Sequence, residues 1–377
     1  MRRNGGQKAE SNRPNLKART AFLLAGFYER IANFTKAAKL YESFYGKYEK
    51  EKRAADALFH AGVYYQGIGR WEKAVELFKM YVAEFKTAKD ASEVYWRVCE
   101  IYDAEKDAKK AAGCWSKFRD KYKKAPKAKV FESRYRLALN YETLKQRPKA
   151  LTEYKWILKT YPKLVKKAQE ADGARLAGAH AAFVMLEPEF KAFKKMKVTL
   201  KKKVLERKVK AAGALAAPDA KSGKSGKYLT VLQYGNGDYG IAALTRMGMV
   251  FRNMANSIRN APVPRRLSED QKEIYRAELD NFALGPEEKA LEAFERALGK
   301  AYELNIYNEW TLKAQDNLKE LNPNKFPEPQ KIGFRGAEGF FVADLDDGSG
   351  AAANDNEEEA EEEETEEEAE VSKGASS

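Results

Sequence analysis

Four tyrosines recur at a nearly constant spacing along the first half of the chain. They are Tyr28, Tyr65, Tyr102 and Tyr141, separated by 37, 37 and 39 residues. A small residue stands three positions before each tyrosine, and an alanine stands nine positions after it. The small residues are Ala25, Gly62, Cys99 and Ala138, and the alanines are Ala37, Ala74, Ala111 and Ala150. A repeat of this length predicts stacked copies of one supersecondary unit.

Three further columns of residues keep the same register. An aromatic residue follows each alanine by four positions (Tyr41, Phe78, Trp115, Tyr154), then a bulky apolar residue (Phe44, Tyr81, Phe118, Ile157), then an aromatic (Tyr48, Phe85, Tyr122, Tyr161). Steps of three and four residues place these side chains on one face of a helix. The small residue and the tyrosine, three apart, share a face of a preceding helix. Each unit therefore predicts a helical hairpin, in which a small side chain lets two helices approach to about 8–10 Å.

This order of small, aromatic and apolar residues resembles the tetratricopeptide repeat over roughly residues 16–162. The resemblance implies an all-α fold, a right-handed α-solenoid of helical hairpins. Units of 37 and 39 residues exceed the usual length of about 34, which favours longer helices or loops. We expect the solenoid to span residues 15–187, with four full units and a fifth first helix from about Lys166 to Leu186, closed by Pro188.

In tetratricopeptide domains the first helices line a concave groove, so the resemblance implies a binding surface. The residue three positions before each small residue should face this groove, and it is aromatic each time: Phe22, Phe59, Trp96 and Tyr135. Acidic residues lie nearby on the same helices: Glu29, Glu93, Glu100, Asp103, Glu132 and Glu142. Such a groove suits an extended or helical segment of a protein partner with apolar and basic side chains. The alternative is that these aromatic side chains pack inside the superhelix.

The segment after the repeats, residues 188–212, is the most basic in the chain. Phe190, Phe193 and Met196 fall on one face, which predicts a single amphipathic helix with lysines on the other. The lysines expected on its basic surface are Lys194, Lys195, Lys201, Lys202, Lys203 and Lys208. Such a helix predicts an alternative function, the binding of nucleic acid or an anionic membrane surface through Lys191–Lys210. It could equally cap the solenoid with its apolar face and leave the lysines in water.

Residues 213–227 are predicted to form a flexible linker, and residues 228–343 a second helical section. Leu244, Met247, Gly248 and Phe251 repeat the first-helix pattern, and Ala290, Phe294 and Ala297 repeat the second-helix pattern. About 30 residues are inserted between the two. Within this insertion Ser268 and Gln271 predict a capping box for a helix through Ala283, which Gly285 ends before Pro286 begins the next. Asn308 is expected to cap a last helix, Glu309 to Leu321.

Charge is distributed unevenly along the chain. The net charge is +13, but residues 344–370 hold 15 acidic residues and no basic one, so the remainder carries about +28. The acidic tail, residues 344–377, and the N-terminal residues 1–14 lack the apolar side chains of a core, and we expect both to be disordered. The tail could serve solubility and cover the basic body, or bind a partner.

The two cysteines do not fix the compartment. Cys99 and Cys114 both fall in the third unit, where we expect two buried thiols in small-residue positions, with a disulfide as the alternative. No run of 18 apolar residues predicts a membrane span, and the charges after Met1 are not followed by the apolar segment of a secretory signal. These features leave the compartment open: the periplasm or outer membrane if the chain is a fragment of an exported protein, and otherwise the cytoplasm.

No catalytic, metal or cofactor motif stands out. The only histidines, His60 and His180, lie on different predicted helices without cysteine or carboxylate at metal spacing. We therefore expect a scaffold that is not an enzyme. Segments such as Leu158–Pro162, Ser268–Tyr275 and Tyr307–Trp310 also look similar to tetratricopeptide proteins of outer-membrane assembly and gliding-motility complexes. This second resemblance implies a scaffold in a bacterial cell envelope.

Overall fold

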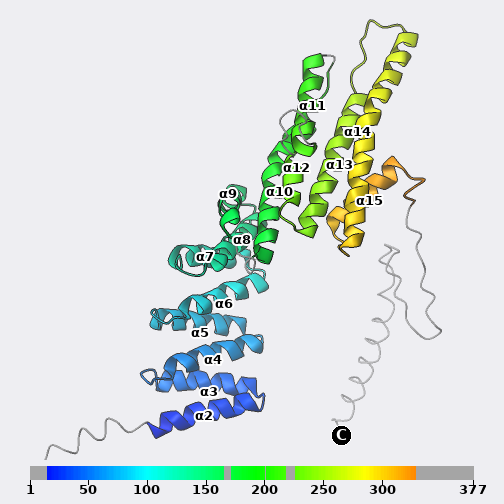
Figure 1. Cartoon of the computed structure of the whole chain (residues 1–377). Coiled ribbons are helices and arrows are strands. Elements are labelled where there is room, and N and C mark those ends of the chain that lie inside the picture. The colour runs from blue at the N-terminus through cyan, green and yellow to red at the C-terminus, as the bar shows by residue number, and fades with distance from the viewer. Residues whose placement is uncertain (1–14, 165–170, 200, 218–225, 328–377) are drawn as a thin grey trace, which may run out of the picture. The chain divides into compact units, whose positions relative to one another are not determined.

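Residues 15–164, 171–199, 201–217 and 226–327 are described by a computed structural model. Within these ranges the regular structure is entirely helical. The first eight helices form four hairpins: α2 (Leu16–Arg30) with α3 (Phe34–Lys47), α4 (Ala54–Gly67) with α5 (Trp71–Glu84), α6 (Ala91–Ala104) with α7 (Ala108–Lys121), and α8 (Lys127–Thr143) with α9 (Arg147–Leu164). Each helix packs on the next along the chain (Figure 1). The predicted all-α solenoid of tetratricopeptide-like hairpins is confirmed.

The repeated columns form the core of these hairpins. The alanines of the second helices, from Ala37 to Ala150, are at most 1% exposed, and the aromatic residues four positions later are at most 2% exposed. A Cβ atom added at Gly62 would lie 2.6 Å from the ring of Phe78, so the first helix approaches the second too closely for a side chain there. The small residue and the aromatic residue therefore fill one shared space, as their spacing predicts.

The turn inside each hairpin also repeats, although its sequence does not. Ala32, Gly69, Lys106 and Lys145 all have positive φ, and their spacing is that of the tyrosines. The backbone N–H of the next residue donates to the carbonyl of the column tyrosine, over 2.8–3.1 Å, at Tyr28, Tyr65, Tyr102 and Tyr141. This left-handed residue with a bond back to the last turn is a Schellman-type helix end. Three of the four positions lack glycine, so only the structure reveals this column.

The two cysteines form a disulfide, which corrects the expectation of two free thiols. Cys99 of α6 and Cys114 of α7 are bonded across the third hairpin, with their Cα atoms 5.3 Å apart. Both are buried, at 0% and 6% exposure. Cys99 stands in the small-residue column of α6, and the packing of α6 on α7 brings the two sulfur atoms within bonding distance.

The segment after the repeats differs from the prediction in two ways. Helix α10 (Ala171–Lys195) continues through Pro188 instead of ending there, and the chain then leaves the helix before α11 (Lys202–Ala216). The single amphipathic helix expected over residues 188–212 is therefore wrong. Crowded lysines at helical spacing repel one another. In addition, Nζ of Lys208 donates to the carbonyl of Met196, which stabilises the end of α10 where the break begins.

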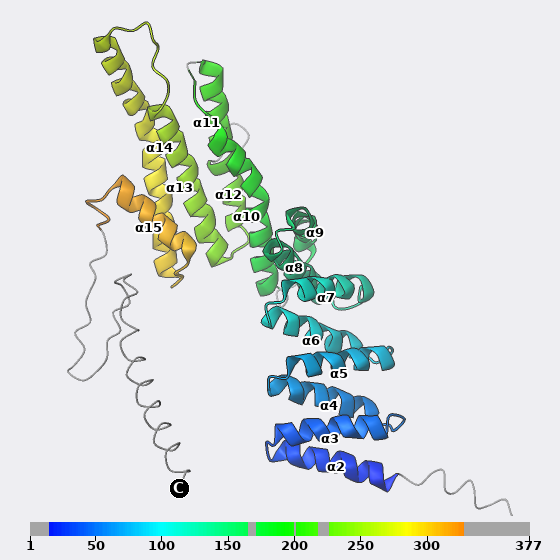
Figure 2. The same cartoon turned by 180° about the vertical axis from the view of Figure 1, so that it is seen from behind.

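The last described helices form the second section. They are α12 (Lys227–Leu232), α13 (Gly237–Arg259), α14 (Glu269–Glu303) and α15 (Glu309–Leu321), and Figure 2 shows α13 beside α14. The capping box at Ser268 and Gln271 and the cap at Asn308 are confirmed. The predicted helix break at Gly285 and Pro286 is wrong, because α14 runs through both residues. Pro286 has no backbone N–H and so removes one hydrogen bond of the helix, but the packing of α14 along α13 outweighs this loss.

Three expected segments remain outside the described residues. These are the N-terminal residues 1–14, residues 218–225 of the linker and the acidic tail, whose predicted disorder stays a prediction. The two ends of the predicted linker are helical instead, because α11 runs to Ala216 and α12 begins at Lys227. The helices that are described contain no stretch long and apolar enough to cross a membrane.

Candidate functional site

The aromatic column of the first helices lies mostly against the core. The ring of Phe22 packs edge-on against Tyr41 and Phe44, 5.3 and 5.4 Å between centroids. Trp96 is 7% exposed, and its ring packs against that of Trp115 with 4.6 Å between the centroids. Phe59 lies 6.1 Å from Phe78 and is half-buried. The alternative reading, that these side chains pack within the superhelix, thus describes Phe22 and Trp96 better than a fully open groove does.

The fourth aromatic residue, Tyr135, joins two parts of the chain. Its hydroxyl lies 3.0 Å from Nδ1 of His180 on α10, whose ring also stacks on Tyr239 of α13 at 4.7 Å. Burial lowers the pKa of His180 to about 4, so the imidazole is neutral at pH 7. The carboxylate Oε2 of Glu142 lies 3.8 Å from Nε2 of His180, and burial raises the pKa of this carboxyl. This cluster connects the fourth hairpin to α13, with His180 buried and Tyr135, Glu142 and Tyr239 half-buried around it.

Most of the predicted acidic residues are paired with local cations. Arg136 on α8 contacts three of them: Glu132 at 2.8 Å, Asp103 at 3.4 Å and Glu100 at 3.6 Å. Asp103 also accepts hydrogen bonds from Trp115 Nε1 and Asn140 Nδ2, both at 2.8 Å. Arg136 was missed by sequence reasoning, although its position four residues after Glu132 was a signal for an ion pair.

The remaining acidic residues are also engaged. Glu93 pairs with Lys129 of α8, and Glu29 accepts a hydrogen bond from the hydroxyl of Tyr41 at 2.7 Å. The surface is therefore a network of ion pairs rather than a uniformly acidic edge. A basic partner would have to compete with these internal cations.

Two hollows nevertheless gather seven of the ten predicted groove residues. The smaller, of about 500 Å³, is lined mainly by charged residues and includes Phe59, Glu93, Trp96, Glu100 and Lys129. The larger, of about 670 Å³, lies on α8 and α10, with Asp103, Glu132, Tyr135 and Arg136 around it. Its apolar wall is formed by Phe131, Leu139, Leu164, Ala174, Leu176 and Ala177. The larger hollow can accept a bulky apolar side chain, because apolar walls with a few polar groups suit ligand burial.

Five of the six lysines predicted for the basic surface are exposed, and one is buried. Lys208 is wrong as a surface residue: it is 1% exposed, and its Nζ donates to Met196 O at 2.5 Å and Ser257 Oγ at 2.6 Å. Burial lowers the pKa of this ammonium group. The other five, Lys194, Lys195, Lys201, Lys202 and Lys203, are exposed. Binding of nucleic acid or an anionic surface through them stays a prediction, without the continuous helix on which it was based.

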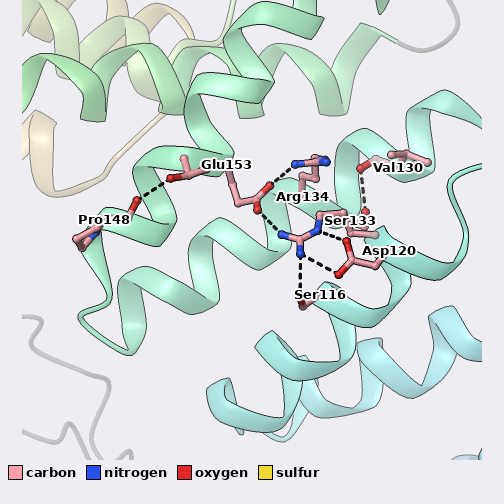
Figure 3. Close-up of polar contacts among 9 residues, drawn as sticks. Ser116, Asp120, Val130, Ser133, Arg134, Pro148 and Glu153 are labelled. Carbon is pink, nitrogen blue, oxygen red and sulfur yellow. Dashed lines mark hydrogen bonds and ion pairs between the residues drawn. The ribbon is translucent and has the colours of Figure 1, made fainter.

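A buried ion cluster between the third and fourth hairpins was not predicted. Glu153 of α9 is 3% exposed and lies between two arginines (Figure 3): Arg119 Nη1 of α7 at 2.5 Å and Arg134 Nη1 of α8 at 2.7 Å. Arg119 also donates to Asp120 and Ser116. The cluster connects three consecutive helices and so fixes the surface on which the larger hollow lies.

A family match covers one hairpin of the chain, and the likenesses to solved structures are weak. No curated protein matches the chain in sequence. A tetratricopeptide repeat protein from Parabacteroides merdae is 11% identical, covering 81% of this chain and 99% of its own, with a TM-score of 0.37. A Podosopora anserina protein of kinesin light chain type, with nearly identical TPR-like repeats, is 17% identical, covering 52% of this chain and 95% of its own, with a TM-score of 0.34. Residues 56–88, the hairpin of α4 and α5, match the tetratricopeptide repeat family itself. The second hairpin of the chain is thus similar to this repeat family.

Proposed function

We propose that this protein is a scaffold without enzymatic activity that binds a segment of a partner protein on the first-helix surface. The larger hollow on α8 and α10 carries the proposal, because it is the apolar depression among the predicted groove residues. The partner segment would insert a bulky apolar side chain there, and its polar groups would meet the pairs around Arg136.

Leu176 offers a direct test, because it lines the hollow and is 36% exposed. Linear peptides selected from a display library on the full chain should carry an aromatic or long aliphatic anchor. We expect Leu176→Asp to weaken their binding by about tenfold or more, since a carboxylate would have to be desolvated against the anchor. Fluorescence anisotropy with labelled peptides measures this change.

Leu312→Asp is the matched control, since Leu312 is 44% exposed on α15 and lies outside the hollow. It should leave the affinities unchanged. Selected peptides that bind the Leu176→Asp chain as tightly as the wild type would contradict the proposed site.

We propose further that the protein works in an oxidising compartment, in a cell-envelope assembly of the outer-membrane or gliding-motility kind that the second resemblance implies. The disulfide between Cys99 and Cys114 supports the compartment, because such bonds persist outside the reducing cytosol. Acid-quenched cells, denatured and treated with a bulky maleimide, should yield unmodified protein, and reduction beforehand should give two adducts. Two adducts without reduction would place the protein in a reducing compartment.

A further inference from the structure

The outer face of α2 is apolar and open, unlike the equivalent face of the first helices α4, α6 and α8. Leu23, Leu24, Phe27 and Ile31 are 49%, 45%, 52% and 54% exposed. Together with Thr20 they occupy positions 20, 23, 24, 27 and 31, which fall on one side of a helix. We call these five residues the end face.

The repeat register shows what normally covers this face. The positions equivalent to Leu24 in the next three units are Ala61, Val98 and Leu137, and all three are 0% exposed. The positions equivalent to Thr20 are Ala57, Val94 and Ser133, also all 0% exposed. In each later unit the preceding second helix lies there, as α3 does on α4. The end face is therefore a stacking surface without its neighbour, which an array of repeats has to cover at its ends.

The α3–α4 contact shows the chemistry that such a neighbour needs. Tyr64, the equivalent of Phe27, stacks on Phe34 at 5.5 Å and faces Tyr41 at 6.0 Å. Phe34 and Tyr41 are seven residues apart on α3, and the fully buried Ala38 stands between them. A helix that covers the end face should carry the same order: an aromatic residue, a small residue four positions later, and another aromatic three positions after that.

Charge argues for a helix from a different protein. Lys17, Arg19 and Arg30 of α2 are exposed and form no ion pair within the described ranges. The carboxylate of Glu29, the acidic residue of α2, accepts from Tyr41. A second copy of this chain would bring the same three cations against each other, whereas an acidic helix would neutralise them. Neither residues 1–14 nor the acidic residues 344–377 of this chain can supply the stripe, because neither segment contains an aromatic residue.

We propose that the end face of α2 binds an acidic amphipathic helix of a partner protein, which stacks on the first hairpin as an additional second helix. Figure 1 shows α2 as the last helix in the row of hairpins, with α3 packed on it. The proposal does not rest on the hollow of α8 and α10, so each can fail without the other.

A library of helical peptides displayed against the full chain tests the proposal. We expect selection of peptides with net negative charge and aromatic residues seven positions apart, around a small residue. Phe27→Glu should weaken their binding by about tenfold or more. Raising the salt concentration should weaken the binding of the same peptides to the wild-type chain. Circular dichroism should show an unchanged fold, because Phe27 is half exposed.

Phe282→Glu on α14 is the matched control, since Phe282 is 69% exposed, and it should leave binding unchanged. Selected helices that bind the Phe27→Glu chain equally well, or that lose binding with Leu176→Asp, would overturn the proposal. Light scattering provides the other decisive outcome. A dimer of the wild-type chain that dissociates on Phe27→Glu would make a second copy the occupant and the proposal wrong.

Discussion

Glu153→Gln should lower the free energy of unfolding of the fourth hairpin by about 3–5 kcal/mol. The carboxylate of Glu153 is 3% exposed and is held at 2.5 Å by Arg119 and 2.7 Å by Arg134. An amide of the same size keeps the packing, but it leaves Arg134 without its carboxylate partner and Arg119 with only the exposed carboxylate of Asp120. Urea unfolding followed by circular dichroism, with hydrogen exchange to locate the change, measures this loss.

Glu132→Gln is the control, because Glu132 pairs with Arg136 at 2.8 Å but its side chain is 46% exposed. An exposed ion pair contributes about 0–1 kcal/mol, so this variant should unfold almost as the wild type does. Faster exchange in α8 and α9 is expected for Glu153→Gln alone. If the two variants exchange alike, the cluster in Figure 3 does not hold these helices together.

Phe294→Ala should destabilise the second section by about 3–5 kcal/mol, the cost of removing a large buried aromatic ring. Phe294 of α14 is 0% exposed, and a Cβ atom at Gly248 of α13 would lie 2.5 Å from its ring. This is the contact of Gly62 with Phe78, reproduced across the inserted residues. Hydrogen exchange of α13 and α14 should become at least about 100-fold faster, because each 1.4 kcal/mol is a factor of ten.

Phe282→Ala on the same helix separates burial from the loss of an aromatic residue. Phe282 is 69% exposed, and surface substitutions usually change stability by about 0.5 kcal/mol or less. We expect its exchange rates to match those of the wild type. Equal effects of the two variants would mean that the Gly248–Phe294 contact is not the core of this section.

The core contacts could be predicted from the sequence, because they depend on spacing. Columns of small and aromatic residues at helical intervals can bury their side chains only if two helices face each other. The pair Gly248 and Phe294 was found in this way despite the insertion. The capping box of Ser268 was also predictable, since it involves residues only three positions apart.

The site was harder to predict, because its side chains are placed by neighbours from other units. Trp96 reads as a groove residue by position, but Trp115 and Phe118 of the next helix bury it. Arg136 converts a row of acidic residues into ion pairs, and Leu176 reaches the hollow only because α10 packs against α8. Sequence register identifies the face of a helix but not what lies opposite.

The sequence by itself determined the hairpins, their order and the side chains that fill them, since local periodicity decides which face of each helix is buried. The tertiary structure decided the features that depend on contacts between distant residues. It joined Cys99 to Cys114, buried Lys208 against Ser257, placed Glu153 between two arginines and carried α14 through Pro286. In each case the favourable energy of a tertiary contact outweighs a local conformational preference of the sequence. The residue that makes this contact is distant in the sequence, so the local pattern does not identify it.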